Sequence, residues 1–220
     1  ISVLRSGEIV GSADPKTANP AELAELMVGR PVSFEVAKAP FTPRDNVLEV
    51  KGITVLRDND EIAVADASFA VRSGEVVGIA GVEGNGQSAL IEALTGLRPV
   101  ARGSVLFEGH DITRASPRER HAMGIAHVPE DRNRMGLISG FTIAENMVLD
   151  TYYDDRFSKG LQIDWPKVHQ EAAKVSVDFD VRTPSVYLHA GALSGGNQQK
   201  VIVGRELSRE TKLVIASQPT

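Results

Sequence analysis

Leu193-Ser-Gly-Gly-Asn-Gln-Gln-Lys200 is the most informative segment of this 220-residue chain. It places a serine, two glycines and an asparagine directly before residues 198–207, which suit a helix. Serine and asparagine are preferred at helix N-caps, and the free amides and positive dipole end of a helix attract anions. The stretch therefore predicts a phosphate-gripping loop, although taken alone it also fits an ordinary capped amphipathic helix.

A second glycine-rich stretch, Gly81-Val-Glu-Gly-Asn-Gly-Gln-Ser88, lies between an apolar run at residues 75–80 and an apolar-periodic helix at residues 87–94. Its glycines permit backbone angles and a close ligand approach that a side chain would block. Successive amides at the start of such a helix converge on one anion, and Ser88 would offer its hydroxyl to Mg²⁺. The stretch predicts a phosphate loop, and alone it also fits a glycine turn in another strand-to-helix unit.

Gln87 stands where phosphate loops of this type carry lysine. An amide donates a hydrogen bond but does not neutralise charge. Losing charge-assisted bonds of roughly 1.5–3 kcal/mol would weaken nucleotide binding by about tenfold or somewhat more. We therefore expect a loop that still holds nucleotide but cradles it poorly for catalysis.

The two loops, in this order, resemble the phosphate loop and the signature loop of ATP-binding cassette (ABC) ATPases. Residues 213–220 resemble that family's second nucleotide-binding strand, with Ser217 and Gln218 where an Asp-Glu pair normally stands. An amide cannot accept the proton of the attacking water, and removing a positioned base costs about 10² to 10⁴ in rate. The resemblance thus implies feeble hydrolysis at this chain's own phosphate loop.

Glu130 falls where the family usually places the glutamine of a loop that senses Mg²⁺ and contacts the transmembrane partner. Its carboxylate would reach metal or water, or it would lie in a solvated turn paired with Arg132 or Arg134. No aromatic residue lies between Leu56 and Ala67 to stack on adenine, and this is a departure from the family pattern.

Residues 81–88, 128–132 with 135–137, and 193–200 with 218–220 resemble the second nucleotide-binding domain of a tandem, double-cassette ATPase from bacterial importers of simple sugars and nucleosides. Gln87 and Gln218 favour the nucleoside branch. The resemblance implies a tail of a preceding cassette at residues 1–30, a linker at 31–45, and a second cassette at 46–220 that ends before the dimer-facing D-loop and the switch histidine.

The implied fold is α/β, a P-loop NTPase of ABC type with a mixed core sheet, an antiparallel β subdomain and a helical subdomain. The implied catalytic residues are Ser194, Gly195 and Gly196, which act on the partner's nucleotide, and Gln218 at the degenerate base position. Nucleotide would be bound by Gly81, Gly84, Asn85, Gly86, Gln87, Ser88, Ala89, Leu193, Asn197 and Gln198, and Mg²⁺ by Ser88 and Glu130.

The implied function is ATP binding in an importer, with ATP and Mg²⁺ as cofactors and hydrolysis by the whole transporter. The expected partners are the first cassette, packed head to tail, the permease at the cytoplasmic face of the plasma membrane and, indirectly, a periplasmic or lipoprotein solute-binding protein. The alternatives are a non-hydrolytic regulatory or scaffold module, and a cytosolic ABC protein acting on nucleic acid or ribosomes. A plain P-loop kinase would not need residues 193–200.

Local patterns predict the remaining elements. Strands are expected at residues 1–10 (two, joined at Ser6-Gly7), 47–55, 63–71, 75–80, 124–128 and, buried, 213–216, with a hairpin at 104–112. Helices are expected after Asn19-Pro20 and Asp164-Trp165-Pro166 and at the capping boxes that begin with Ser116 and Thr142.

Composition narrows the classes of protein to which the chain could belong. The net charge of −5 argues against nucleic-acid binding, which requires clustered Lys and Arg. Zero cysteines exclude disulfides and thiolate metal sites. No run of about 18 apolar residues and no signal-peptide pattern are present, so neither a membrane span nor an export signal is expected.

Overall fold

The computed structural model describes residues 1–5, 7–31, 42 and 44–219. The chain divides into two compact units, Ile1–Thr42 and Pro43–Thr220. Most of the expected linker, residues 31–45, lies outside the described residues, so the domain boundaries stay predictions.

The first unit contains a hairpin and one helix. Strands β1 (Ser2–Arg5) and β2 (Glu8–Ser12) pair antiparallel, and helix α1 spans Pro20–Val28. The side chain of Asn19 accepts a 2.9 Å hydrogen bond from the amide of Ala21, which caps the helix. Both expected strands and the helix start are confirmed, while Ser6 lies outside the described residues.

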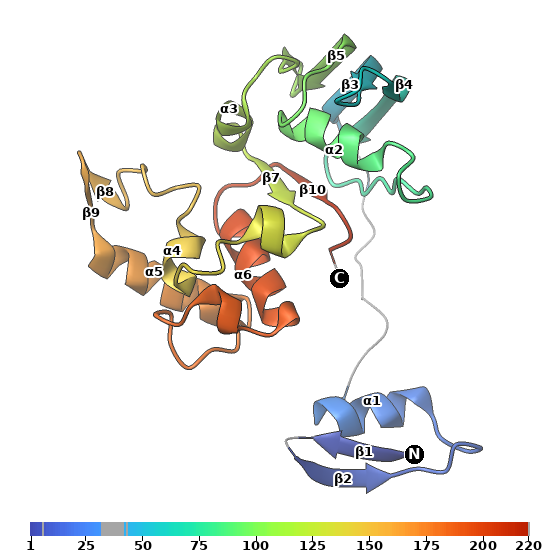
Figure 1. Ribbon diagram of the computed structural model, residues 1–220, viewed down its shortest axis with the longest axis vertical. Helices are drawn as coiled ribbons and strands as arrows, with labels where there is room; N and C mark the ends of the chain where they lie inside the picture. Colours follow the sequence, from blue (N-terminus) through green and yellow to red (C-terminus); the bar gives the residue numbers. More distant parts are fainter. Residues whose placement is uncertain (6, 32–41, 43, 220) are drawn as a thin grey trace. The chain divides into compact units, whose positions relative to one another are not determined.

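An antiparallel sheet in the order β4-β3-β5-β6 forms one part of the second unit. Its strands are β3 (Asn46–Leu56), β4 (Ile62–Arg72), β5 (Arg102–Phe107) and β6 (His110–Asp111), and helix α2 (Gln87–Thr95) packs against β3 and β4 (Figure 1). Leu90 and Leu94 of α2 share a core with Val50, Ile53 and Val105 of the sheet. The predicted antiparallel subdomain, hairpin and helix are confirmed.

Two parallel strands, β7 (Ile125–Val128) and β10 (Leu213–Ala216), pair so that Val128 faces Ala216. Helix α3 (Pro117–Ala122) precedes β7. The prediction that residues 213–216 are buried holds for Leu213 and in part for Ile215, which packs against the core, but it is wrong for Val214, which is 46% exposed, and for Ala216.

The predicted strand at residues 75–80 is wrong. These residues carry no regular structure, and Val76 and Ile79 are exposed. A strand requires a neighbour that accepts and donates its backbone hydrogen bonds, and no described strand pairs with this run. An apolar, β-branched sequence is therefore not enough by itself to form a strand at residues 75–80.

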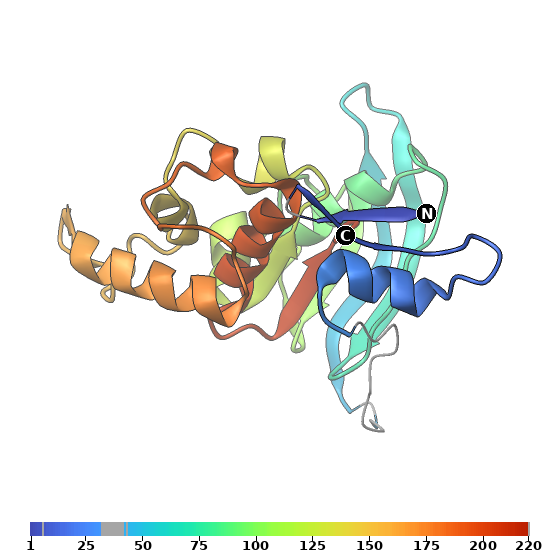
Figure 2. The same cartoon turned by 90° about the horizontal axis from the view of Figure 1, so that it is seen from below.

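A helical part completes the second unit. It contains the π-helix η1 (Arg132–Gly136), α4 (Ile143–Met147), α5 (Trp165–Asp178), the short 3₁₀ helix η2 (Ala190–Ala192) and α6 (Gly195–Leu207), with the small hairpin β8 (Ser158–Lys159) and β9 (Gln162–Ile163). Figure 2 shows α5, in orange, running beside α6, in red. Their shared core includes Ile143, Val168, Ala172 and Ile202.

The local helix signals are confirmed. Ser116 and Thr142 each form a reciprocal capping box, with Glu119 and Glu145, and Asp164 caps α5. In each box the carboxylate accepts from the cap's amide, which holds the pKa of Glu119 and Glu145 below its usual value. These helices therefore begin where sequence alone placed them.

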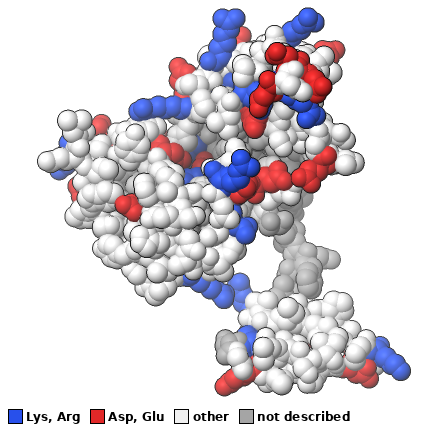
Figure 3. All heavy atoms as spheres, in the orientation of Figure 1, with Lys and Arg blue, Asp and Glu red and all other residues white. Residues whose placement is uncertain are grey.

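Among the described residues, no helix is both long enough and apolar enough to cross a membrane. On the face drawn in Figure 3, basic and acidic side chains are mixed over the second unit.

Candidate nucleotide-binding site and signature loop

The loop between residues 81 and 88 leads directly into α2. Gly84 (φ 87°) and Gly86 (φ 101°) lie in the left-handed region that favours glycine, and Gly86 is the N-cap of α2. A Cβ at Gly86 would overlap the carbonyl oxygen of Ala63, so this glycine lets the loop lie against the start of β4. The loop therefore presents helix-start amides beside the antiparallel sheet, as an anion site requires.

A hollow with a volume of about 440 Å³ opens beside this loop. It is lined by residues of the loop and of α2 and by the turn between β3 and β4: Arg57, Asp58, Asn59, Ala63, Gly84, Gly86, Ser88, Ala89, Glu92 and Arg98. The predicted nucleotide contacts Gly84, Gly86, Ser88 and Ala89 thus border one cavity, together with Arg57 and Arg98, which sequence reasoning missed.

Gln87 folds back over its own loop. Its Nε2 donates a 3.2 Å hydrogen bond to the carbonyl of Val82, and the side chain covers Gly81. Ser88 lines the hollow with an exposed side chain, so its hydroxyl is available to a cation. The loop fits a phosphate group, but its own side chains bring no positive charge.

The signature loop begins α6 with its serine outside the helix. Ser194 is the N-cap, and its Oγ accepts a 3.0 Å hydrogen bond from Nδ2 of Asn197. Asn197 also accepts from the amide of Arg182 at 2.9 Å, which ties the loop to the segment that follows α5. Ser194 and Gly196 are exposed, and a Cβ at Gly196 would contact nothing within 4 Å. The hydroxyl and the first amides of α6 are accordingly open to an incoming anion.

Arg132 closes the other side of this loop. Its guanidinium packs against Gly195, where a Cβ would collide with it, and its Nε donates to Oε1 of Gln198 at 3.2 Å. Gln198 is buried and donates in turn to the carbonyl of Ala190. The predicted helix start at Gln198 is wrong by one turn, because α6 begins at Gly195. Gln198 consequently anchors the loop through its contacts with Arg132 and Ala190.

The ends of β7 and β10 bring Glu130 and Gln218 together. Nε2 of Gln218 donates a 2.6 Å hydrogen bond to Oε1 of Glu130. The expected pairing of Glu130 with Arg132 or Arg134 is wrong: among the described residues Glu130 accepts from Gln218, whereas Arg132 donates to Gln198. No hydrogen bond or ion pair in the described part of the chain joins Glu130 to Ser88, so a shared Mg²⁺ site stays a prediction.

With this geometry in view, the comparison with known families decides the identity. The model of the ABC transporter family matches residues 64–220. The chain belongs to the ABC transporter family. The cassette resembles solved structures accordingly: a nucleotide-free ATP-binding cassette from an ABC transporter, at a TM-score of 0.64 and 24% identity, is matched over 80% of this chain and 70% of that chain.

An ATP-binding cassette dimer in a post-hydrolysis state bound to ADP and Pi also has a TM-score of 0.64, at 23% identity, over 79% of this chain and 74% of that chain. These likenesses confirm the ABC ATPase fold, with its mixed α/β core, antiparallel sheet and helical part.

Curated relatives of this ABC cassette are longer proteins. The guanosine import ATP-binding protein NupO of Bacillus subtilis (strain 168) is 45% identical over 220 residues, which are all of this chain and 43% of that protein. The nucleoside import ATP-binding protein NupA of Lactococcus lactis subsp. cremoris (strain MG1363) is 44% identical over all of this chain and 44% of its own length. The ribose import ATP-binding protein RbsA 2 of Rubrobacter xylanophilus (strain DSM 9941 / JCM 11954 / NBRC 16129 / PRD-1) is 36% identical over 41% of its length. The chain spans less than half of the length of these relatives.

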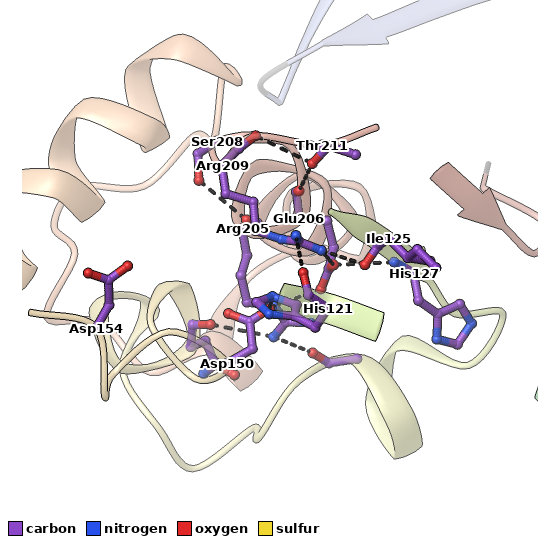
Figure 4. A network of polar contacts seen from close by, with 12 residues as sticks. His121, Ile125, His127, Asp150, Asp154, Arg205, Glu206, Ser208, Arg209 and Thr211 are labelled. Atoms are coloured by element: carbon purple, nitrogen blue, oxygen red, sulfur yellow. Dashed lines mark hydrogen bonds and ion pairs between the residues drawn. The ribbon is translucent and has the colours of Figure 1, made fainter. Parts of the chain in front are cut away.

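A polar network in the ABC cassette, drawn in Figure 4, joins α3, β7, α4 and α6 and was missed by sequence reasoning. His121 pairs with Asp150 at 3.0 Å, and Arg205 lies 3.2 Å from Glu206 and 3.7 Å from Asp150. Arg209 donates to the carbonyls of His121 and Ile125 at 2.9 and 2.6 Å. The network fixes the C-terminal half of the signature helix to β7.

Two titrating groups in the network have altered pKa values. Burial opposes the ionisation of Asp150, but the hydrogen bond from His121 and the charge of Arg205 together hold the pKa of Asp150 below its usual value. Burial, with the charge of Arg205, lowers the pKa of His127, whose amide donates to Glu206 while its ring points away in Figure 4. Although His121, Asp150 and Glu206 place possible metal ligands within 4.8 Å of one another, Arg205 and Arg209 already neutralise these carboxylates.

Proposed function

We propose that this cassette is an ATP-binding component of an importer for nucleosides or simple sugars, coupling ATP binding and hydrolysis to solute uptake. One contrast carries the proposal: Ser194 and Gly196 are open to an anion, whereas Gln87 and Gln218 leave the cassette's own phosphate loop without a lysine and without a carboxylate base. The cassette is equipped to act on a nucleotide held elsewhere.

The nucleotide held elsewhere belongs to a first cassette of the same protein. Residues 1–30 form the tail of that cassette and residues 46–220 form the second one, packed head to tail with it. Two observations support this arrangement: curated relatives matched over all of this chain are more than twice as long, and residues 1–42 form a unit of their own.

The two composite sites have different tasks. At the productive site, Ser194 and the amides of Gly195 and Gly196 contact the γ-phosphate on the first cassette's phosphate loop, where charge develops during hydrolysis. At the other site, residues 81–89 hold nucleotide through loop amides with little turnover. When bound, Mg²⁺ would neutralise phosphate charge there, and Ser88 is the residue placed to hold it.

The expected partners are membrane permease subunits, which place the protein at the cytoplasmic face of the plasma membrane, and indirectly a solute-binding protein. The solute class is supported by the relatives, because those named for guanosine and nucleoside import are 45% and 44% identical and a ribose importer component is 36% identical. Gln87 and Gln218 also favour the branch of importers that carry nucleosides.

Steady-state ATP turnover by the intact transporter tests this division of labour. Ser194→Arg should abolish turnover because the bulky side chain fills the anion site, whereas Gln87→Ala should leave it nearly unchanged. Thr183→Arg, a change of similar size elsewhere in the helical part, serves as the control. The opposite pattern for Ser194 and Gln87 would discard the proposal, and a complete lack of turnover in the wild type would favour a non-hydrolytic regulatory or scaffold module.

A further inference from the structure

We propose that Arg57 supplies the positive charge that this cassette's own phosphate loop lacks, and that it binds the phosphate groups of a nucleotide held there. The inference rests on the proposed function, because it assumes that residues 81–89 hold a nucleotide. It assigns a binding role to a residue far from the loop in sequence.

Arg57 lies in the tight turn between β3 and β4. Its amide donates to the carbonyl of Glu61 at 2.7 Å, and its carbonyl accepts from the amide of Asp60 at 3.1 Å. Its side chain crosses to the phosphate loop, where Nη2 donates a 2.9 Å hydrogen bond to the carbonyl of Gly84. The guanidinium therefore lies at the rim of the hollow, beside the loop that precedes α2.

Arg98 holds this turn in place. Its Nη1 donates to the carbonyl of Leu56 at 3.0 Å and to Oδ1 of Asp58 at 2.8 Å, and its Nε donates to Oε2 of Glu92 on α2 at 2.6 Å. Its contacts thus fall on the two residues that flank Arg57. A turn fixed to the helix in this way keeps Arg57 near the loop, which lowers the entropic cost of binding a ligand.

The charges around the hollow leave Arg57 as the available cation. Arg98 is paired with both Asp58 and Glu92, whereas no carboxylate lies within ion-pair distance of Arg57 among the described residues. Apart from the bond to Gly84, the Arg57 guanidinium forms no hydrogen bond in that part of the chain. Its remaining donors are free for a ligand.

A phosphate is the ligand that fits this combination. Guanidinium binds phosphate through paired, charge-assisted hydrogen bonds, which are about twice as strong as neutral ones. The bond to the Gly84 carbonyl is a neutral-acceptor bond that a phosphate oxygen would outcompete. Gln87 contributes no charge, so one arginine from the sheet would replace the cation that the loop lost.

The test uses the intact protein and a photoreactive ATP analogue. Labelling is quantified only in the peptide that contains residues 81–98, so that the signal reports nucleotide bound at this loop. Competition by ATP, inorganic triphosphate and adenosine is measured for the wild type, Arg57→Ala, Arg57→Lys and Arg102→Ala. Arg102 is an exposed arginine of the same sheet that does not line the hollow, so its variant is a matched control for lost charge. Thermal unfolding of each variant verifies folding.

In Arg57→Ala, competition by ATP and by triphosphate should weaken by about tenfold, the cost of a lost charge-assisted contact. Adenosine competition should not change, Arg57→Lys should recover part of the loss, and Arg102→Ala should match the wild type. Equal weakening for adenosine would overturn the inference in favour of a contact with the base, and no weakening would overturn it outright. Absence of labelling at residues 81–98 in the wild type would instead refute nucleotide binding by this loop, and with it that part of the proposed function.

Discussion

Nε2 of Gln218 donates a 2.6 Å hydrogen bond to Oε1 of Glu130, and this contact joins the ends of the parallel strands β10 and β7. The resemblance to ABC ATPases places glutamine at position 130 and glutamate at position 218. In this chain the two positions still hold one amide and one carboxylate, but the two groups are exchanged relative to the family pattern.

This exchange predicts how a base could be restored. Gln218→Glu alone would place two carboxylates side by side, and their repulsion would push the new side chain away from Glu130. The double variant E130Q/Q218E retains the hydrogen bond with its direction reversed. In a Ser194→Arg background, which blocks the productive site, the double variant should raise residual ATP turnover by at least about tenfold over the single variant. Equal turnover in both would show that the contact does not control the base.

Gly86→Ala should disturb the phosphate loop more than an ordinary glycine substitution. Its φ of 101° disfavours alanine, and the added Cβ would also meet the carbonyl of Ala63. We expect a loss of roughly 1–3 kcal/mol in the free energy of unfolding, measured by urea titration. Gly109→Ala is the control, because Gly109 also has a positive φ (79°) but open space around it. An equal loss in both variants would contradict a steric role for Ala63.

Arg120→Lys should destabilise the cassette by about 2–4 kcal/mol. Arg120 is 2% exposed and donates to the carbonyls of Ala93 and Leu94 at the end of α2 and to those of Ala115, Ile112 and Thr113. A lysine ammonium cannot reach these carbonyls together and would leave several buried without a donor. Denaturant unfolding measures the loss, with the exposed Arg102→Lys as control, and a change below about 0.5 kcal/mol would refute the role.

The network around Asp150 predicts an acid-dependent stability. Because the pKa of Asp150 is lowered in the folded state, its contribution is fully present above the unfolded value of about 3.9 and is lost as the pH falls through the folded value. The free energy of unfolding should therefore fall less steeply below about pH 4 in Asp150→Asn than in the wild type. His121→Gln should give an intermediate slope, since Arg205 still faces the carboxylate. If the free energy of unfolding changed with pH in the same way in the wild type and in both variants, this account would be contradicted.

Structural features formed by residues close together in the sequence were predicted correctly more often than features that need a distant partner. The capping boxes at Ser116 and Thr142 and the cap at Asp164 were predicted correctly, because each is formed by residues three apart. The hairpins near residues 1–10 and 104–112 were predicted because their paired strands are neighbours in the sequence, whereas the small hairpin of β8 and β9 was not predicted. The prediction of a strand at residues 75–80 was wrong, because a strand also requires a hydrogen-bonding partner, which a local pattern cannot supply.

Sequence motifs were enough to predict the family, two loops expected to bind anions, and the groups missing at Gln87 and Gln218, since short motifs encode backbone geometry and side-chain chemistry directly. Three contacts became visible only in the folded structure: Arg57 with Gly84, Glu130 with Gln218, and Arg205 of the signature helix with Gly136 and Asp150. Each of these contacts joins residues distant in the chain. Their pairing follows from how sheets and helices pack, which no local spacing reveals.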